Sequence, residues 1–209
     1  MKARESLRDA RLLLVTDPRP DLTSRVRAAV RGGVDVVQLR DKHAPREELV
    51  PLAAELREIC ESEGAIFTVN DDVKLARITG AAGIHLVGQE DTGTRDVRAL
   101  LGPDTIVGRS AGTLVEAMEA LREGADYLGI GAVYATPTKP EGDVGGLRLV
   151  QEISRANFPI PWFAIGGVTM QTAPEVAAAG ASGFAVVRAI LDAEDPEAAA
   201  REMRSHLAG

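Results

Sequence analysis

Short apolar segments alternate with amphipathic stretches along almost the whole chain. Each apolar segment is rich in Val, Ile and Leu, which predicts a buried β-strand. The eight predicted strands are Leu12–Thr16, Val34–Leu39, Ile66–Asn70, Gly83–Leu86, Thr105–Gly108, Tyr127–Gly129, Pro161–Ile165 and Gly183–Val187. Helical periodicity follows each strand and is clearest at Leu22–Arg31, Arg46–Glu63, Leu114–Glu123, Thr172–Ala179 and Pro196–His206. This alternation predicts parallel strands connected by helices.

A glycine-containing junction recurs where a predicted helix gives way to the next strand. It occurs as Gly32-Gly33, Gly80-Ala81, Gly124-Ala125 and Gly180-Ala181, and glycine is the residue that commonly ends a helix. The fold class is therefore predicted to be α/β, a single-domain (β/α)8 TIM barrel over residues 1–209, with a doubly wound open sheet as the alternative. In such a barrel the site would lie at the carboxyl ends of the strands.

Composition and charge narrow the function classes. Hydrophobic residues make up 45% and charged residues 26% of the chain, as in ordinary globular proteins. A net charge of −7 argues against a surface that binds nucleic acid as a whole. The charged first residues and the lack of a run of about 20 apolar residues predict a cytoplasmic protein without a signal peptide or membrane contact. Cys60 is the single cysteine, and we expect it in the core.

Polar and apolar side chains alternate at the end of the second predicted strand. Gln38, Arg40 and Lys42 would share one face, while Val37 and Leu39 would share the other and face the helices. Three polar side chains, two of them cationic, would suit a multiply charged anion such as pyrophosphate. Solvated charges at an exposed strand end are the alternative interpretation.

Carboxylates follow the third and fourth predicted strands. Asp71 comes after Asn70, and Asp91 follows the next strand along the chain. Adjacent barrel strands would bring both to one rim, where Mg²⁺ could bind between them and a substrate phosphate. A helix cap is the alternative role for an aspartate at the end of the third strand, and Asp72 and Glu90 compete with Asp71 and Asp91 for the two metal roles.

Three later segments could bind substrate. Ser110 follows the fifth predicted strand, where its hydroxyl can donate or accept a hydrogen bond. The long segment 131–146 contains Thr136, Thr138 and Lys139 and is predicted to be a lid or binding loop.

Gly166-Gly167 after the seventh strand and Val187-Arg188 after the eighth occupy the places where barrels commonly bind phosphate. The histidines, His43, His85 and His206, lack the spacing of a zinc site. We therefore expect all three to be structural or exposed.

Taken together, these segments resemble the thiamine phosphate synthase family. The motifs occur in family order between Leu12 and Ile190 and are Gln38 to Lys42, Val69-Asn70-Asp71, His85 to Asp91, Thr136 to Lys139, Ala164 to Gly167 and Val186 to Ile190. The combination is specific although each piece alone is not.

The resemblance implies a Mg²⁺-dependent transferase. It would join 4-amino-5-hydroxymethyl-2-methylpyrimidine pyrophosphate to 4-methyl-5-(2-phosphoethyl)thiazole and release pyrophosphate. Arg40, Lys42, Ser110 and Lys139 would be catalytic, and Asp71 and Asp91 would bind the metal. The substrate-binding set would be Gln38, Arg40, Lys42, Asn70, Ser110, Thr136, Thr138, Lys139, Gly167, Val187 and Arg188. Ser110 would lie near the pyrimidine.

The sequence departs from the family pattern at three positions: Val87 is a one-residue insertion, Gly112 replaces a frequent histidine, and Arg188 replaces a frequent serine. Two alternative functions remain, a thiazole tautomerase-like paralogue and a non-catalytic phosphate-binding barrel. Asp71, Asp91 and Lys139 argue against the paralogue, which tends to lack them. A homodimer is implied only by the resemblance.

Overall fold

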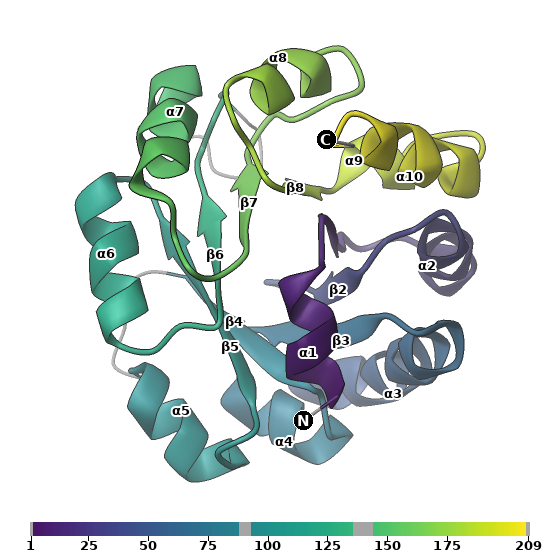
Figure 1. The fold of residues 1–209 in the computed structure, drawn as a ribbon. Helices are drawn as coiled ribbons and strands as arrows, with labels where there is room; N and C mark the ends of the chain where they lie inside the picture. Colours follow the sequence, from purple (N-terminus) through teal and green to yellow (C-terminus); the bar gives the residue numbers. More distant parts are fainter. Residues whose placement is uncertain (1, 88–92, 136–143, 208–209) are drawn as a thin grey trace.

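The computed structural model describes residues 2–87, 93–135 and 144–207 and forms a closed barrel of eight parallel strands (Figure 1). Each strand pairs with its neighbours in the sequence, and β1 also pairs with β8. The strands are β1 Leu12–Val15, β2 Val36–Leu39, β3 Ile66–Asn70, β4 Gly83–Leu86, β5 Ile106–Ala111, β6 Tyr127–Ile130, β7 Trp162–Ile165 and β8 Phe184–Val186. The prediction of a TIM barrel is confirmed, and the open sheet is wrong.

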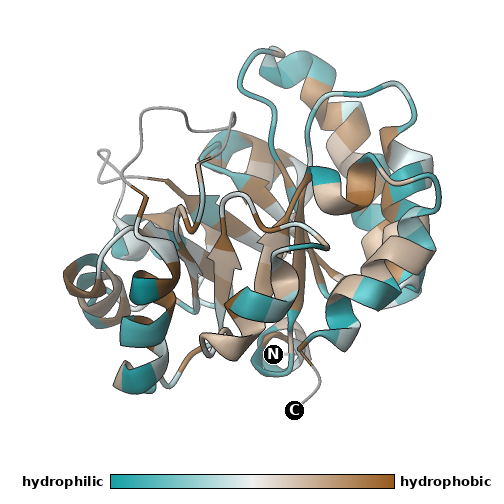
Figure 2. Cartoon of the chain, turned by 90° about the horizontal axis from the view of Figure 1, so that it is seen from above, coloured by the Kyte–Doolittle hydropathy of each residue, from teal (hydrophilic) through white to brown (hydrophobic). Residues whose placement is uncertain are grey.

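The helices form the outer layer of the barrel. They are α1 Lys2–Arg8, α2 Leu22–Arg31, α3 Arg46–Glu63, α4 Val73–Thr79, α5 Thr94–Leu101, α6 Leu114–Arg122, α7 Gly146–Ala156, α8 Ala173–Ala178, α9 Arg188–Leu191 and α10 Pro196–Ser205. The bounds of α2 and α3 agree with the prediction. Hydrophobic residues concentrate on the strands and on the inner faces of the helices (Figure 2). Among the residues that the structure describes, no helix is both long and apolar enough to cross a membrane.

Alternating strand residues divide the core into two parts. Val37 and Leu39 pack in the cluster between strands and helices, as the sequence predicted. Val36 packs inside the barrel with Tyr127 and Phe163, and Gln38 shares this inward face and is only 3% exposed. The period of two along a strand therefore directs Gln38 into the barrel.

Helix α1 closes the amino-terminal end of the barrel and was not predicted. Its Leu7, together with Ala10, packs against the interior cluster, and the Arg4 guanidinium donates to the Thr105 carbonyl, just before β5. Figure 1 shows α1 in front of the ring of strands. The segment is mostly charged, so its few apolar residues give no clear periodic signal.

Several strand boundaries differ from the predicted ones. β5 continues to Ala111 rather than ending at Gly108, because Ser110 and Ala111 still pair with β6. β2 begins at Val36 rather than Val34. Asp35, just before β2, accepts hydrogen bonds from the backbone N–H groups of Arg11 and Leu12 at 2.7 and 2.9 Å. It therefore joins the starts of two strands through its side chain.

Candidate functional site

The carboxyl ends of all eight strands lie at one end of the barrel, opposite α1, because the strands are parallel. Arg40 follows β2 at this rim, where its backbone N–H donates to the Thr16 hydroxyl at 2.9 Å. The Thr16 side chain is only 1% exposed. This buried hydroxyl fixes the backbone from which the Arg40 side chain extends.

A pocket of about 500 Å³ opens beside the ends of β2 and β3. Its lining residues are Asp41, Lys42, Arg46, Asn70, Asp71, Asp72, Val73 and Lys74. Three of the predicted site residues, Lys42, Asn70 and Asp71, therefore share one cavity. Lys42 was predicted to share the face of Gln38 by strand alternation, but β2 ends at Leu39. Lys42 instead lies exposed in the loop before α3.

Asp71 has an unusual backbone conformation that presents its carboxylate at the rim. Its φ is 56°, in the left-handed region that aspartate tolerates better than most residues. Its backbone N–H donates to the His85 carbonyl at 2.9 Å. Its two carboxylate oxygens accept hydrogen bonds from the Val87 backbone N–H at 2.8 Å and from the Asn70 amide at 2.6 Å. The inserted Val87 thus helps to orient the predicted metal ligand.

The side chains around Asp71 suit a hard cation. The Asn70 Oδ1 atom is buried and has no hydrogen-bond partner among the described residues. Asp71 is exposed and forms no ion pair with a described lysine or arginine. Carboxylate and amide oxygens are the ligands that Mg²⁺ and Ca²⁺ prefer. No group of three or more candidate metal ligands occurs within the described ranges, and the second predicted ligand, Asp91, lies outside them.

Asp72 has a structural role, which removes one competitor for the metal site. Its carboxylate accepts from the Leu75 backbone N–H at 2.9 Å and caps α4. It also forms an ion pair with Arg46 at 2.7 Å. A carboxylate engaged in both contacts stabilises the first turn of a helix. The other competitor, Glu90, lies outside the described residues.

A buried polar group lies inside the barrel beneath the rim. His85 on β4 is 5% exposed, with Nδ1 3.1 Å from the Tyr127 hydroxyl and Nε2 3.0 Å from the Ser110 Oγ. Burial, and secondarily the positive charge of Arg109, lowers the pKa of His85 to about 4. His85 is structural, as predicted, but its contact with Ser110 was missed because the two residues are 25 positions apart in the sequence.

Two glycines in the left-handed region follow β7, where a phosphate site was predicted. Gly166 and Gly167 have φ values of +95° and +67°, and a Cβ at Gly167 would lie 2.6 Å from the Tyr134 Cβ. Only glycine fits here without strain. No described residue accepts a hydrogen bond from the Gly167 N–H. Val187 immediately precedes α9, and Arg188 is its first residue.

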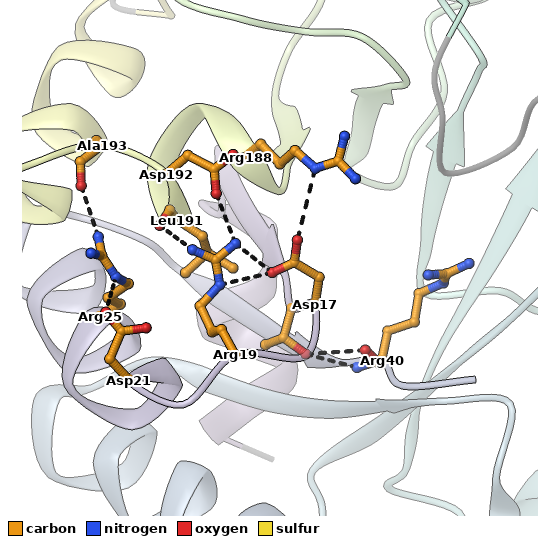
Figure 3. Close-up of polar contacts among 10 residues, drawn as sticks. Asp17, Arg19, Asp21, Arg25, Arg40, Arg188, Leu191, Asp192 and Ala193 are labelled. Carbon is orange, nitrogen blue, oxygen red and sulfur yellow. Dashed lines mark hydrogen bonds and ion pairs between the residues drawn. The ribbon is translucent and has the colours of Figure 1, made fainter. Parts of the chain in front are cut away.

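An ion-pair network holds Arg188 at this end of the barrel (Figure 3). The Arg188 Nε lies 3.9 Å from one Asp17 oxygen, and the other Asp17 oxygen is 2.6 Å from Arg19. Arg19 also pairs with Asp192 at 2.9 Å and donates to the Leu191 carbonyl. The guanidinium groups of Arg188 and Arg40 extend to the same side of this network in Figure 3.

Sequence reasoning missed Asp17 and Arg19. Their position could have identified them, because they lie in the loop after β1 at the predicted functional end of the barrel. Thr136, Thr138 and Lys139 lie outside the described residues. The segment that leads to them is joined to β7, since the backbone N–H groups of Val133 and Tyr134 donate to the carbonyls of Ile165 and Gly166, both at 2.9 Å.

Known proteins give independent evidence about the chain. Residues 12–190 match the family described as thiamine monophosphate synthase. A thiamine-phosphate synthase from Thermobifida fusca is 45% identical over 98% of this chain and 95% of its own length. Another, from a Synechococcus species, is 44% identical over 97% of this chain, but the match covers only 58% of that relative. The chain therefore spans less than two thirds of the cyanobacterial relatives that it matches.

The structural comparison agrees with the sequence comparison. A thiamine phosphate pyrophosphorylase from Pyrococcus furiosus superposes with a TM-score of 0.85 and 35% identity, covering 98% of this chain and 96% of the other. An aldolase structure at 20% identity and a TM-score of 0.72 shares the barrel fold alone. The extent of the sequence match and the close structural likeness place this chain in the thiamine monophosphate synthase family.

Proposed function

We propose that this chain condenses 4-amino-5-hydroxymethyl-2-methylpyrimidine pyrophosphate with 4-methyl-5-(2-phosphoethyl)thiazole, giving thiamine phosphate and pyrophosphate. The observation that carries the proposal is one pocket containing Lys42, Asn70 and the oriented Asp71 carboxylate, in a chain of this family. The pocket combines donors for a pyrophosphate with acceptors for a cation.

The pyrimidine pyrophosphate is assigned to the rim beside β2 and β3. Arg40 and Lys42 contribute positive charge, while Gln38 and Asn70 contribute amide groups. Lys139 is assigned to the same anion from the segment after β6. Guanidinium and ammonium groups bind phosphate oxygens strongly because the hydrogen bonds are charge-assisted.

Asp71 and Asp91 are proposed to hold Mg²⁺. The unpartnered Asn70 Oδ1 and the Asp71 carboxylate, which lacks an ion pair among the described residues, support this assignment. When bound, the ion would neutralise charge on the pyrophosphate. The preference for Mg²⁺ over other divalent ions belongs to the proposal, because oxygen ligands alone suit several hard cations.

The thiazole phosphate is assigned to the rim beside β7 and β8. Gly167 and the backbone at Val187 and Arg188 would donate N–H groups, and the Arg188 guanidinium would add charge. Thr136 and Thr138 would contribute hydroxyls. The left-handed glycines support close approach of a phosphate to the backbone.

The chemistry needs little proton transfer from the protein. The bond between the exocyclic pyrimidine carbon and the pyrophosphate oxygen breaks, and its electron pair leaves with pyrophosphate. The thiazole nitrogen then supplies the electron pair of the new carbon–nitrogen bond. Arg40, Lys42 and Lys139 stabilise the charge that develops on the leaving group. The neutral, buried His85 is not required as a base.

Mixing both substrates with Mg²⁺ and measuring pyrophosphate and thiamine phosphate tests the proposal. We expect equal amounts of the two products. A non-catalytic phosphate-binding barrel would bind substrate and release no pyrophosphate, and a tautomerase-like enzyme would isomerise a thiazole without consuming the pyrimidine. Either result would overturn the assignment.

A cytoplasmic location and a homodimer also remain proposals. Sedimentation of the purified chain measures its oligomeric state directly. A single species at the mass of one chain, at the concentrations used in the assay, would contradict the homodimer.

A further inference from the structure

The end of β1 contacts two arginines of the proposed site. In the closed barrel β1 lies between β8 and β2, so the residues after β1 lie between the arginines that follow those two strands. The Thr16 hydroxyl accepts from the Arg40 backbone N–H at 2.9 Å. The next residue, Asp17, has one carboxylate oxygen 3.9 Å from the Arg188 Nε. Figure 3 shows both contacts.

Arg19 holds the Asp17 carboxylate in place. Its guanidinium donates to Asp17 at 2.6 Å, to Asp192 at 2.9 Å and to the Leu191 carbonyl at the end of α9. The Arg19 side chain is only 15% exposed. Because a planar guanidinium bonded to two carboxylates and a carbonyl has little freedom to move, it fixes the position of both partners. Asp17 is therefore oriented before any ligand binds.

Asp17 contacts only one edge of the Arg188 guanidinium. The carboxylate faces Nε, and the Nη atoms form no hydrogen bond or ion pair with a described residue. A guanidinium has five N–H donors in a planar fork, so a contact at Nε leaves the Nη donors available for phosphate oxygens. In Figure 3 the Nη atoms of Arg188 point away from Asp17, to the same side as the Arg40 guanidinium.

The charges of this network are balanced among the described residues. Two carboxylates, Asp17 and Asp192, are matched by two guanidinium groups, Arg19 and Arg188. Asp17 can therefore orient Arg188 without leaving an excess of negative charge that would repel an anion at the rim.

We propose that Asp17, held by Arg19, is a positioning residue that directs the Nη donors of Arg188 towards the phosphate of the second substrate. The inference rests on the proposed function in one respect, because that function identifies the anion as the phosphate of 4-methyl-5-(2-phosphoethyl)thiazole. Arg188 stands where serine is frequent in the family. This chain thus adds a guanidinium, and a carboxylate that orients it, to the backbone N–H groups proposed for this phosphate.

Asp17→Asn distinguishes positioning from simple electrostatics by the sign of its effect. Removal of a negative charge near a bound anion would by itself tighten binding, whereas loss of the contact to Arg188 weakens it. We expect the dissociation constant of the thiazole phosphate to rise about fivefold. Isothermal titration calorimetry without the pyrimidine substrate measures it. An unchanged or lower dissociation constant would contradict the proposal.

Asp192→Asn is the matched control, because Asp192 pairs with the same Arg19 but makes no contact with Arg188 among the described residues. It removes the same charge and should leave the dissociation constant unchanged or slightly lower. An equal rise in Asp17→Asn and Asp192→Asn would show that the charge balance around Arg19, and not the direction of Arg188, explains the effect.

Arg188→Ser tests whether Asp17 acts through Arg188. It introduces the residue that is frequent in the family and should raise the dissociation constant about tenfold, since a charge-assisted contact is lost. Adding Asp17→Asn to this variant should change binding less than twofold, because the side chain that Asp17 orients is absent. A further fivefold loss in the double variant, with the fold confirmed by circular dichroism, would overturn the proposal.

The alcohol 4-methyl-5-(2-hydroxyethyl)thiazole identifies the group that Arg188 contacts. Because the alcohol lacks the phosphate, its affinity should be equal in the wild type and in all three single variants. Equal losses for the alcohol and the phosphate would contradict the proposal. In turnover assays, Asp17→Asn should raise the KM for the thiazole phosphate more than it lowers kcat, since the contact also stabilises the bound ground state.

The binding series also separates this inference from the proposed function. If the wild type binds the thiazole phosphate but forms no thiamine phosphate, the proposed function fails, while the calorimetry still decides the role of Asp17. A wild type that does not bind the thiazole phosphate would overturn both.

Discussion

At the scale of single residues, environment assigns different roles to neighbouring carboxylates. Asp71 and Asp72 are adjacent in the sequence, yet Asp71 stands in a left-handed conformation at the rim, while Asp72 caps α4 and pairs with Arg46. The left-handed conformation of Asp71 directs its side chain towards the pocket, while the Asp72 side chain caps α4. Two adjacent aspartates therefore have different surroundings, and only Asp71 is left for the proposed metal role.

Asp71→Asn tests the metal role without disturbing the backbone, because asparagine also tolerates the left-handed region. We expect pyrophosphate release to fall about 100-fold or more, as is typical when one electrostatic contact to the transition state is lost. The activity should be measured across a Mg²⁺ titration.

Asp41→Asn is the matched control, because Asp41 lines the same pocket but accepts hydrogen bonds from the backbone of His43 and Ala44. It should change activity far less. Comparable losses in both variants would indicate that general charge in the pocket, and not a ligand at position 71, explains the effect.

His85 gives the folded protein a defined dependence on pH. Its folded pKa of about 4 lies below its ordinary value of 6.5, so between these values the unfolded state binds the proton more readily. Stability from this residue is present above pH 6.5 and is lost as the pH falls towards 4.

Urea unfolding at pH 7.5 and pH 5.0 measures this effect. The free energy of unfolding should fall by about 2 kcal/mol more in the wild type than in His85→Gln, which has no titrating ring. The comparison removes the contribution of the carboxylates, which titrate in both proteins. Equal pH dependence in the two would mean that His85 is not held neutral by the fold.

At the scale of elements, helix caps and glycines shape the turns between a strand and the helix that follows it. Asp72 supports the start of α4, and Gly166 and Gly167 turn the chain sharply after β7. These junctions lie at the functional end of the barrel. Their geometry therefore positions the backbone that is proposed to bind substrate as well as the helices.

Asp72→Ala should lower the free energy of unfolding by roughly 1 to 2 kcal/mol, because it removes a helix cap and a partly exposed ion pair. Asp72→Asn keeps a capping oxygen and should lose less. Denaturant titration measures both, and assays below the unfolding transition should give near-normal turnover. A large loss of turnover in folded Asp72→Asn would instead indicate a direct part in catalysis.

At the scale of the whole molecule, the two ends of the barrel have different tasks. Helix α1 covers the amino-terminal end, where Leu7 packs with interior residues. The opposite end carries the pocket and the ion-pair network of Asp17 and Arg19. The end covered by α1 and the end that carries the proposed site are thus separated along the barrel axis, as is usual for this architecture.

Leu7→Ala tests how much the packing of α1 against the barrel stabilises the fold. Leu7 is 2% exposed, and truncation of a buried leucine costs about 2 to 5 kcal/mol when the cavity cannot close. Ile78→Ala is the control, since Ile78 is 61% exposed and should change stability little. Thermal unfolding followed by circular dichroism measures both. An equally small change in both variants would show that α1 docks only loosely.

The prediction from sequence succeeded where local pattern controls structure. The period of two along β2 correctly assigned Val37 and Leu39 to the helices, and the bounds of α2 and α3 agree with the predicted ones. The prediction was incomplete at α1, where too few apolar residues occur to give a clear helical period. The roles of Asp91, Thr136, Thr138 and Lys139 stay predictions, because these residues lie outside the described ranges.

By itself, the order of apolar and polar residues determined the eight strands, the main helices and the end of the barrel where polar side chains gather, because hydrophobic periodicity is a local property of a chain. Only the tertiary structure decided that Ser110 meets His85, that Asp17 meets Arg188, and that Asp72 belongs to a cap. The first two contacts join segments far apart in the sequence, which closure of the barrel brings together, and the third depends on the local backbone conformation at the start of α4.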